Sequence, residues 1–166
     1  MTEWQPLDAE RIFTVLAAHE VEYVVTGGIA MQVYGHPRMS GNVDLIPSPT
    51  PRNLQRLTAA LQELWAHVLN PGDEHLEINA QMLPRKTCWQ LATRHGDINV
   101  LRDLPGEAPF PRLQERVFPV KLGDHTIPIA SRDDLIKMKR AAGKPADLAD
   151  IAALTEAEHR RPGARW

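Results

Sequence analysis

The stretch VVTGGIAMQVYGHPRMSGNVDLI, residues 24–46, decides the fold predicted for this chain. It opens on β-branched residues that are typical of a strand, passes through Gly27-Gly28, and continues with a helix-compatible run over residues 29–34. The alternation of polar and apolar side chains over residues 42–46 then predicts a second strand with one buried face. The stretch therefore predicts a strand, a tight turn, a short helix and a further strand.

The glycine pair Gly27-Gly28 lies at the predicted junction of strand and helix. Because glycine has no side chain, a phosphate can approach the backbone N–H groups there, at the positive end of the following helix. Such a pair alone indicates a tight turn more often than a phosphate site. Asn42 and Asp44 add to its value, because positions i and i+2 of a strand project to the same side and two side-chain oxygens can share one divalent cation.

Asp97 and Asn99 repeat the same i, i+2 arrangement on a second predicted strand. If the two strands are neighbours in the sheet, four oxygen-bearing side chains converge on one site. The sequence predicts this site only on the assumption that the strands are adjacent.

The rest of the chain predicts an α/β (α+β) domain with a mixed sheet of about five or six strands and two closing C-terminal helices. Leu54, Leu57, Leu61 and Leu64 form the clearest helical stripe, which Thr50 can cap. The other expected elements are a helix after Asp8, strands over 21–25, 87–93 and 97–101, a hairpin over 117–122 and 125–130, helices over 132–142 (capped by Ser131 with Asp134) and 146–158, and loop or short strand over 67–86.

Length and composition indicate one domain over residues 1–158, followed by a flexible basic tail over residues 159–166. The net charge of -2 provides no general basic field for nucleic acid. Cys88, the single cysteine, excludes an intramolecular disulfide and a cysteine-built zinc site, so a reducing, cytoplasmic setting is expected. No apolar stretch approaches the roughly 20 residues that span a bilayer, and no membrane association is expected.

Taken together, these residues resemble the nucleotidyltransferase superfamily, in particular its minimal and AbiEii-like toxin branch. The branch has a glycine pair, a short helix, and then Arg-x-Thr/Ser-x-Asp-φ-Asp, where φ is apolar. The matching blocks are Gly27 to Ala30, Tyr34-Gly35 with Arg38, Ser40 and residues 42–45, then Gly96 to Leu101 with the third aspartate position, and Ile129 to Asp150 with the closing helices. The resemblance spans roughly residues 20–154.

The resemblance implies magnesium- or manganese-dependent transfer of a nucleotidyl group from a nucleoside triphosphate to an acceptor, which can be RNA, a protein or a small molecule. Two metal ions held by three aspartates perform that reaction in the family. Carried over position by position, the catalytic set is Asp44, Asn42, Asn99 and Lys139, the nucleotide-binding set is Gly27, Gly28, Arg38 and Ser40, and the metal set is Asp44, Asn42 and Asp97. Arg38 has an equal alternative, an ion pair that fixes the loop before the strand.

The departures from the family pattern fall on Asn42 and Asn99, which occupy the first and third aspartate positions. An asparagine offers a carbonyl oxygen but no negative charge, so metal binding should be much weaker and the transfer activity weakened or lost. Asp97 could substitute only in part, because it is displaced by about 7 Å along its strand. The alternative function is a non-catalytic member that binds a nucleotide, RNA or a protein partner, within a bacterial toxin–antitoxin module. Deliberate replacement of one or both aspartates is a third explanation of the asparagines.

Overall fold

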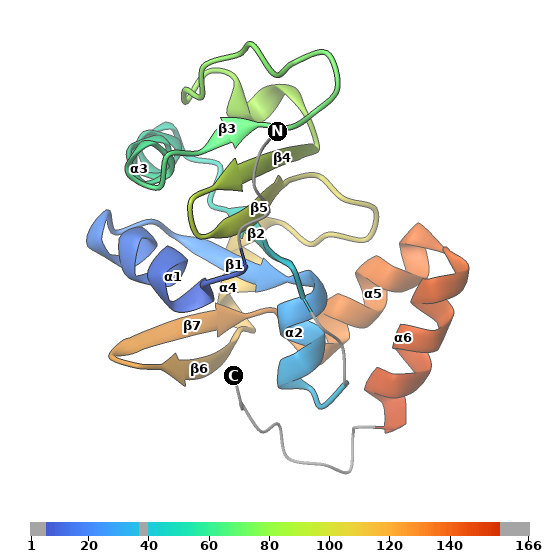
Figure 1. Cartoon of the computed structure of the whole chain (residues 1–166). Coiled ribbons are helices and arrows are strands. Elements are labelled where there is room, and N and C mark those ends of the chain that lie inside the picture. The colour runs from blue at the N-terminus through green and yellow to red at the C-terminus, as the bar shows by residue number, and fades with distance from the viewer. Residues whose placement is uncertain (1–5, 37–39, 157–166) are drawn as a thin grey trace.

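In the computed structural model, which describes residues 6–36 and 40–156, the chain forms a seven-stranded mixed sheet with helices on both sides (Figure 1). The strand order is β3-β4-β5-β2-β1-β7-β6. The strands are β1 (Tyr23–Thr26), β2 (Asn42–Pro47), β3 (His67–Val68), β4 (Cys88–Thr93), β5 (Gly96–Leu101), β6 (Phe118–Leu122) and β7 (His125–Ile129). The helices are α1 (Ala9–Ala18), α2 (Gly27–Val33), α3 (Pro51–Glu63), α4 (Phe110–Glu115), α5 (Arg132–Ala142) and α6 (Pro145–Glu156), with a 3-10 turn at Leu83–Arg85.

The predicted helix starts are confirmed by their capping hydrogen bonds. The Asp8 side chain accepts from the Arg11 N–H at the start of α1, and Thr50 accepts from the Asn53 N–H at the start of α3. Ser131 accepts from the Asp134 N–H at the start of α5. These side chains satisfy backbone donors that the first turn of a helix leaves unpaired.

The predicted fold class is confirmed, with two corrections. The sheet has seven strands rather than five or six, because the two-residue strand β3 pairs with β4. Such a short edge strand leaves no periodic pattern in the sequence. The helix α4 was not predicted, because its six residues contain Pro111 and no full apolar repeat. Within the described residues, no helix is long and apolar enough to cross a membrane.

The hydrophobic core lies on the side of the central strands opposite to the predicted site. Val43 and Leu45 of β2 and Ile98 of β5 are completely buried, whereas the polar residues that alternate with them are partly or fully exposed: Asn42, Asp44, Asp97 and Asn99. Figure 1 shows α1 and α3 to one side of the sheet and the α5–α6 pair to the other. The period of two along β2 and β5 thus gives one face to the core and leaves the other face for polar side chains.

Candidate functional site

The four polar residues predicted to converge lie on the adjacent parallel strands β2 and β5. The register aligns Asp44 with Asn99, which we call the inner row, and Asn42 with Asp97, which we call the outer row. In the inner row, Nδ2 of Asn99 donates a hydrogen bond of 2.7 Å to Oδ1 of Asp44. Each aspartate therefore has an asparagine as its cross-strand neighbour, and the assumption that these strands are adjacent is confirmed.

Gly27 gives the Asp44 carboxylate its space. Its φ of +68° lies in the left-handed region, and a Cβ on Gly27 would lie 1.9 Å from Oδ2 of Asp44. A side chain at this position would therefore strain the backbone and overlap with the carboxylate. The helix α2 begins at Gly27 itself, so the glycine pair forms the first turn of the helix rather than a separate turn.

Gly28, the second glycine of the pair, packs against Ser40. A Cβ at Gly28 would lie 3.0 Å from the Ser40 hydroxyl, which donates a 2.6 Å hydrogen bond to the Asn42 carbonyl oxygen. Ser40 thus lies beside the glycine pair, as the nucleotide-binding prediction requires, but its proton is engaged by the backbone. Arg38, predicted with it, lies outside the described residues.

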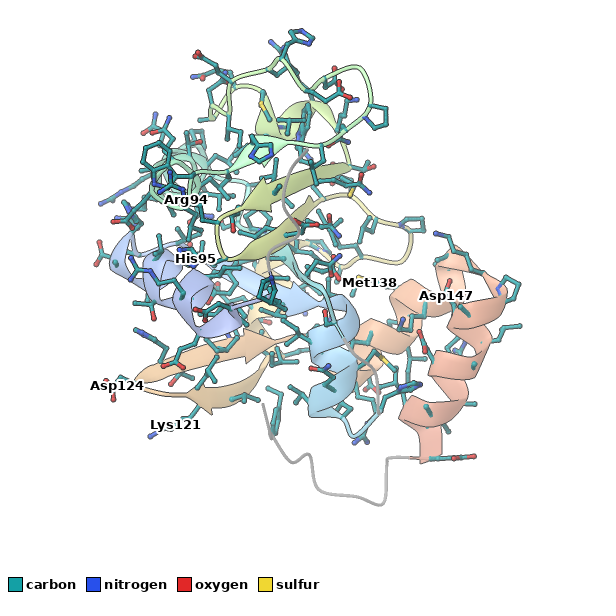
Figure 2. The ribbon with its side chains drawn as sticks, viewed as in Figure 1. Arg94, His95, Lys121, Asp124, Met138 and Asp147 are labelled. Carbon is teal, nitrogen blue, oxygen red and sulfur yellow. The ribbon has the colours of Figure 1, made fainter. Side chains whose placement is uncertain are left out.

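A cavity of about 540 Å³ opens beside the inner row, within the range of small-molecule sites. Figure 2 shows Met138 on α5 and Asp147 on α6, the two helices that stand together beside the sheet. Thr26 also lines the cavity and is the cross-strand partner of Asp44 on β1, a site position that the sequence reasoning missed although it precedes Gly27. The lining residues are Thr26, Gly27, Asp44, Leu101, Leu104, Pro105, Leu135, Met138, Lys139, Ala142, Lys144 and Asp147.

Lys139 reaches this cavity from α5, with its ammonium group held by two carboxylates of α6. Its Nζ atom donates a hydrogen bond of 2.7 Å to Oδ2 of Asp150 and lies 3.8 Å from Oδ1 of Asp147. The Asp150 side chain is buried, so this charge-assisted bond lies in a region of low dielectric constant. Lys139 lines the cavity as a paired cation, and the two aspartates orient it.

The charge of Asp44 also reaches Cys88 on β4. Burial raises the pKa of the Cys88 thiol, and the negative charge of Asp44 raises this pKa further. The thiol is therefore mainly protonated near neutrality, which suits a structural role better than a nucleophilic one.

The donor set does not fit a two-metal site. Asp44 is the single carboxylate of the inner row, and its Oδ1 accepts a hydrogen bond from an amide. Nowhere in residues 6–36 and 40–156 do three or more His, Cys, Asp or Glu side chains form a group that could hold a metal ion. Asn42 and Asp97 are neighbours in the outer row, two residues from Asp44 along the strand.

Comparison with known proteins places the fold among the nucleotidyltransferases. No family model matches the chain, and no curated protein matches it. The lincosamide antibiotic adenylyltransferase LnuA, in its lincomycin-bound structure, matches with a TM-score of 0.57 and 14% identity over 92% of this chain and 99% of that one. A protein from Thermotoga maritima described as a nucleotidyltransferase matches with a TM-score of 0.53 and 14% identity over 94% and 97% of the two chains. The chain has the nucleotidyltransferase fold; at this identity the likeness shows the fold alone.

The predicted site residues thus divide into two groups. The structure brings Gly27, Asp44 and Lys139 to one cavity and joins Asn99 to Asp44. Asn42, Asp97, Gly28 and Ser40 are not among the described residues that line this cavity, although Gly28 and Ser40 contact each other beside it.

Proposed function

We propose that this chain is a nucleotide-binding protein of the nucleotidyltransferase type whose metal-dependent transfer activity is weak or lost. The observation that carries the proposal is the position of Asp44, which lies against Gly27 and accepts a hydrogen bond from Asn99 beside a cavity that Lys139 also lines. A glycine that leaves room for a close approach and an ammonium group at one cavity suit a phosphate-bearing ligand, and Asp44 stands at the position that carries metal in the family that the sequence resembles.

The cavity walls support a ligand with an apolar portion as well as phosphates. Leu101, Leu104, Pro105, Leu135 and Met138 line one part of the cavity, and Lys139 and Lys144 bring cationic groups to it. A nucleoside triphosphate combines a flat base, which such apolar walls can cover, with an anionic chain that lysine can neutralise. The ligand class is therefore a nucleoside triphosphate.

The bond between Asn99 and Asp44 supports weak or absent catalysis. In a two-metal site the carboxylates face cations, whereas here an amide N–H satisfies Asp44 without a metal. The same bond favours the second candidate, a non-catalytic member that keeps the fold to bind a nucleotide, RNA or a protein partner. Binding of the nucleotide is common to both candidates, and transfer separates them.

The finer assignments stay predictions. The acceptor is RNA, a protein or a small molecule, and the lincosamide adenylyltransferase supports a small molecule by fold likeness only. The AbiEii-like branch, the toxin–antitoxin module and the protein partner are proposed on the resemblance of the sequence alone, and the cytoplasmic location is proposed on the single cysteine, Cys88.

A binding and transfer assay tests the proposal. The parent protein and the Asn42→Asp/Asn99→Asp double variant are each given labelled ATP, GTP, CTP or UTP with magnesium or manganese, and total RNA as acceptor. We expect both proteins to bind a triphosphate, and label transfer to be faster in the double variant by about 10²-fold or more, because it carries the family's three carboxylates.

The control is Asp97→Asn, which removes a carboxylate from the outer row and should leave triphosphate binding unchanged. Absence of triphosphate binding by both the parent and the double variant would contradict the proposed function. Efficient transfer by the parent would contradict only the loss of catalysis.

A further inference from the structure

His36, two residues after the α2 C-cap Tyr34, faces the carboxylate that holds Lys139. Nε2 of His36 lies 3.5 Å from Oδ1 of Asp150, and Oδ2 of the same carboxylate accepts the 2.7 Å hydrogen bond from Lys139. Asp150 is only 4% exposed. Nδ1 of His36 is itself buried and has no hydrogen-bond partner among the described residues. One buried carboxylate therefore stands between an imidazole and the ammonium group at the cavity.

The contact between His36 and Asp150 lies next to charged groups that line the cavity. Asp44 and Asp147 line the cavity together with Lys139 and Lys144, and Asp150 lies behind Lys139. A proton on His36 adds a positive charge 3.5 Å from the Asp150 carboxylate that holds Lys139. In a partly buried site this charge is poorly screened, so it favours the entry of an anionic triphosphate.

We propose that His36 is a positioning residue that controls, through Asp150, whether Lys139 is available to a phosphate. This inference rests on the proposed function. When a proton from solvent binds His36, the imidazolium pairs with Asp150, and Lys139 can turn from this carboxylate toward a phosphate in the cavity. When the proton leaves, Asp150 and Asp147 again compensate Lys139. Only a proton moves between solvent and imidazole, and no covalent bond of the ligand changes.

The surroundings of His36 make it the group through which pH acts on the cavity. From α6 it faces Asp150 directly and Asp147 beyond it, and from α5 it faces Lys139 through Asp150. The Arg132 guanidinium lies over the ring of Tyr34, 5.4 Å from the ring centroid, and Tyr34 is two residues before His36. None of the described residues that line the cavity is a histidine, so imidazole protonation reaches the cavity only through a neighbour.

The test measures binding of inorganic triphosphate to the full chain by calorimetry at about pH 8 and about pH 5.5, on either side of the range in which imidazole titrates. Three proteins are compared: the parent, His36→Gln, and the matched control His19→Gln. His19 is also paired with a carboxylate, Glu63, at 3.2 Å, but this pair joins α1 and α3 away from the cavity.

We expect the affinity for triphosphate to rise as the pH falls from about 8 to about 5.5. The ratio of the two affinities should be at least about fivefold larger for the parent and His19→Gln than for His36→Gln. Protonation of triphosphate itself affects all three proteins equally and cancels in this comparison. Equal pH dependence in the parent and His36→Gln overturns the proposal.

A second measurement needs no ligand. The side-chain ¹⁵N NMR signal of the Lys139 ammonium group should move between the two pH values in the parent and in His19→Gln, and stay in place in His36→Gln. If His36→Gln does not fold, the parent decides alone, because a Lys139 signal that does not move overturns the proposal. If triphosphate binds none of the proteins, the proposed function fails, and the NMR result still supports or overturns the role of His36.

Discussion

The inner and outer rows contain the same pair of residue types in opposite order, and they differ in exposure, in hydrogen bonding and in contact with the cavity. Asp44 of the inner row lies against Gly27, accepts a 2.7 Å hydrogen bond from Asn99 and lines a cavity. Asp97 of the outer row is exposed beside Asn42, and it is not among the described residues that line this cavity. Two residues along each strand therefore separate a constrained carboxylate from a solvated one.

The difference shows that burial and neighbouring groups, more than residue type, decide how strongly each Asp/Asn pair interacts with nearby charges. A carboxylate next to an amide in water keeps its hydration and gains little from its neighbour. A carboxylate held between a glycine backbone and an amide, in a partly buried site, interacts more strongly with every charge near it. Substitutions matched between the two rows can measure that difference.

Replacement of Gly27 by alanine should break the inner row and have the largest effect. The added Cβ would overlap with Oδ2 of Asp44 and force a left-handed conformation on alanine. We expect a loss of about 2–4 kcal/mol in the free energy of unfolding, together with loss of triphosphate binding. Urea denaturation followed by circular dichroism measures the first effect, and calorimetry the second.

Gly41→Ala is the control for this prediction. No atom lies within 4 Å of a Cβ built at Gly41, so a change of no more than about 0.5 kcal/mol is expected. Equal stability of the Gly27→Ala and Gly41→Ala proteins would show that Asp44 can move away at no cost, and would contradict the constrained inner row.

The same change of asparagine to aspartate should have different effects in the two rows. Asn99→Asp removes the amide that donates to Asp44 and places two carboxylates side by side. We expect it to destabilise the metal-free protein by about 1–3 kcal/mol near neutral pH, whereas Asn42→Asp beside Asp97 should cost no more than about 0.5 kcal/mol. Thermal melting of the two variants in a chelator makes the comparison.

The sign of the pH effect follows from the repulsion. It requires both carboxylates to be ionised, so the deficit of Asn99→Asp should shrink as the pH falls and one of them is protonated. Magnesium should restore stability to this variant more than to Asn42→Asp. Identical melting temperatures for the two variants under all these conditions would mean that the rows are equivalent.

The smallest effect concerns Cys88 on β4, whose thiol pKa depends on the charge of Asp44 in the inner row. Because the charge of Asp44 contributes to the raised pKa of this thiol, Asp44→Asn should lower the pKa and shift the pH–rate profile of alkylation by iodoacetamide toward lower pH. Asp97→Asn should leave the profile in place. We expect a rate increase of about two- to threefold at a fixed pH for the first variant, and equal rates for the two variants would contradict this coupling.

Most of the fold could be predicted because its elements carry local signals. The leucine stripe with the cap at Thr50 predicted α3, and the alternation around Asp44 predicted β2, since each pattern lies within a few residues of the chain. For the short strand β3 the sequence predicted only loop or short strand over residues 67–86, and the helix α4 was not predicted. Both are too short to show a period, and they form because neighbouring parts of the chain provide their pairing and burial.

The site was predictable only in part, for the same physical reason. The sequence indicated that Asp44 and Asn99 lie on strands with polar faces, but 55 residues separate them, and no local pattern states which residue faces which across two strands. Thr26 and His36 were missed because their importance comes from Asp44 and Asp150, neither of which is near them in the chain.

The sequence alone thus determined most of the strands and helices and the two faces of β2 and β5, and it predicted that Asn42 and Asn99 stand at aspartate positions of the family that it resembles. Tertiary structure decided that Asp44 pairs with Asn99, that Asp97 pairs with Asn42, and that Asp150 joins Lys139 to His36. Periodicity can be identified from the sequence because the side chains of a strand lie alternately in the core and at the surface, and this alternation involves neighbouring residues only. Register and long-range ion pairs depend on how whole elements pack, and that packing sets where the charges of this protein meet.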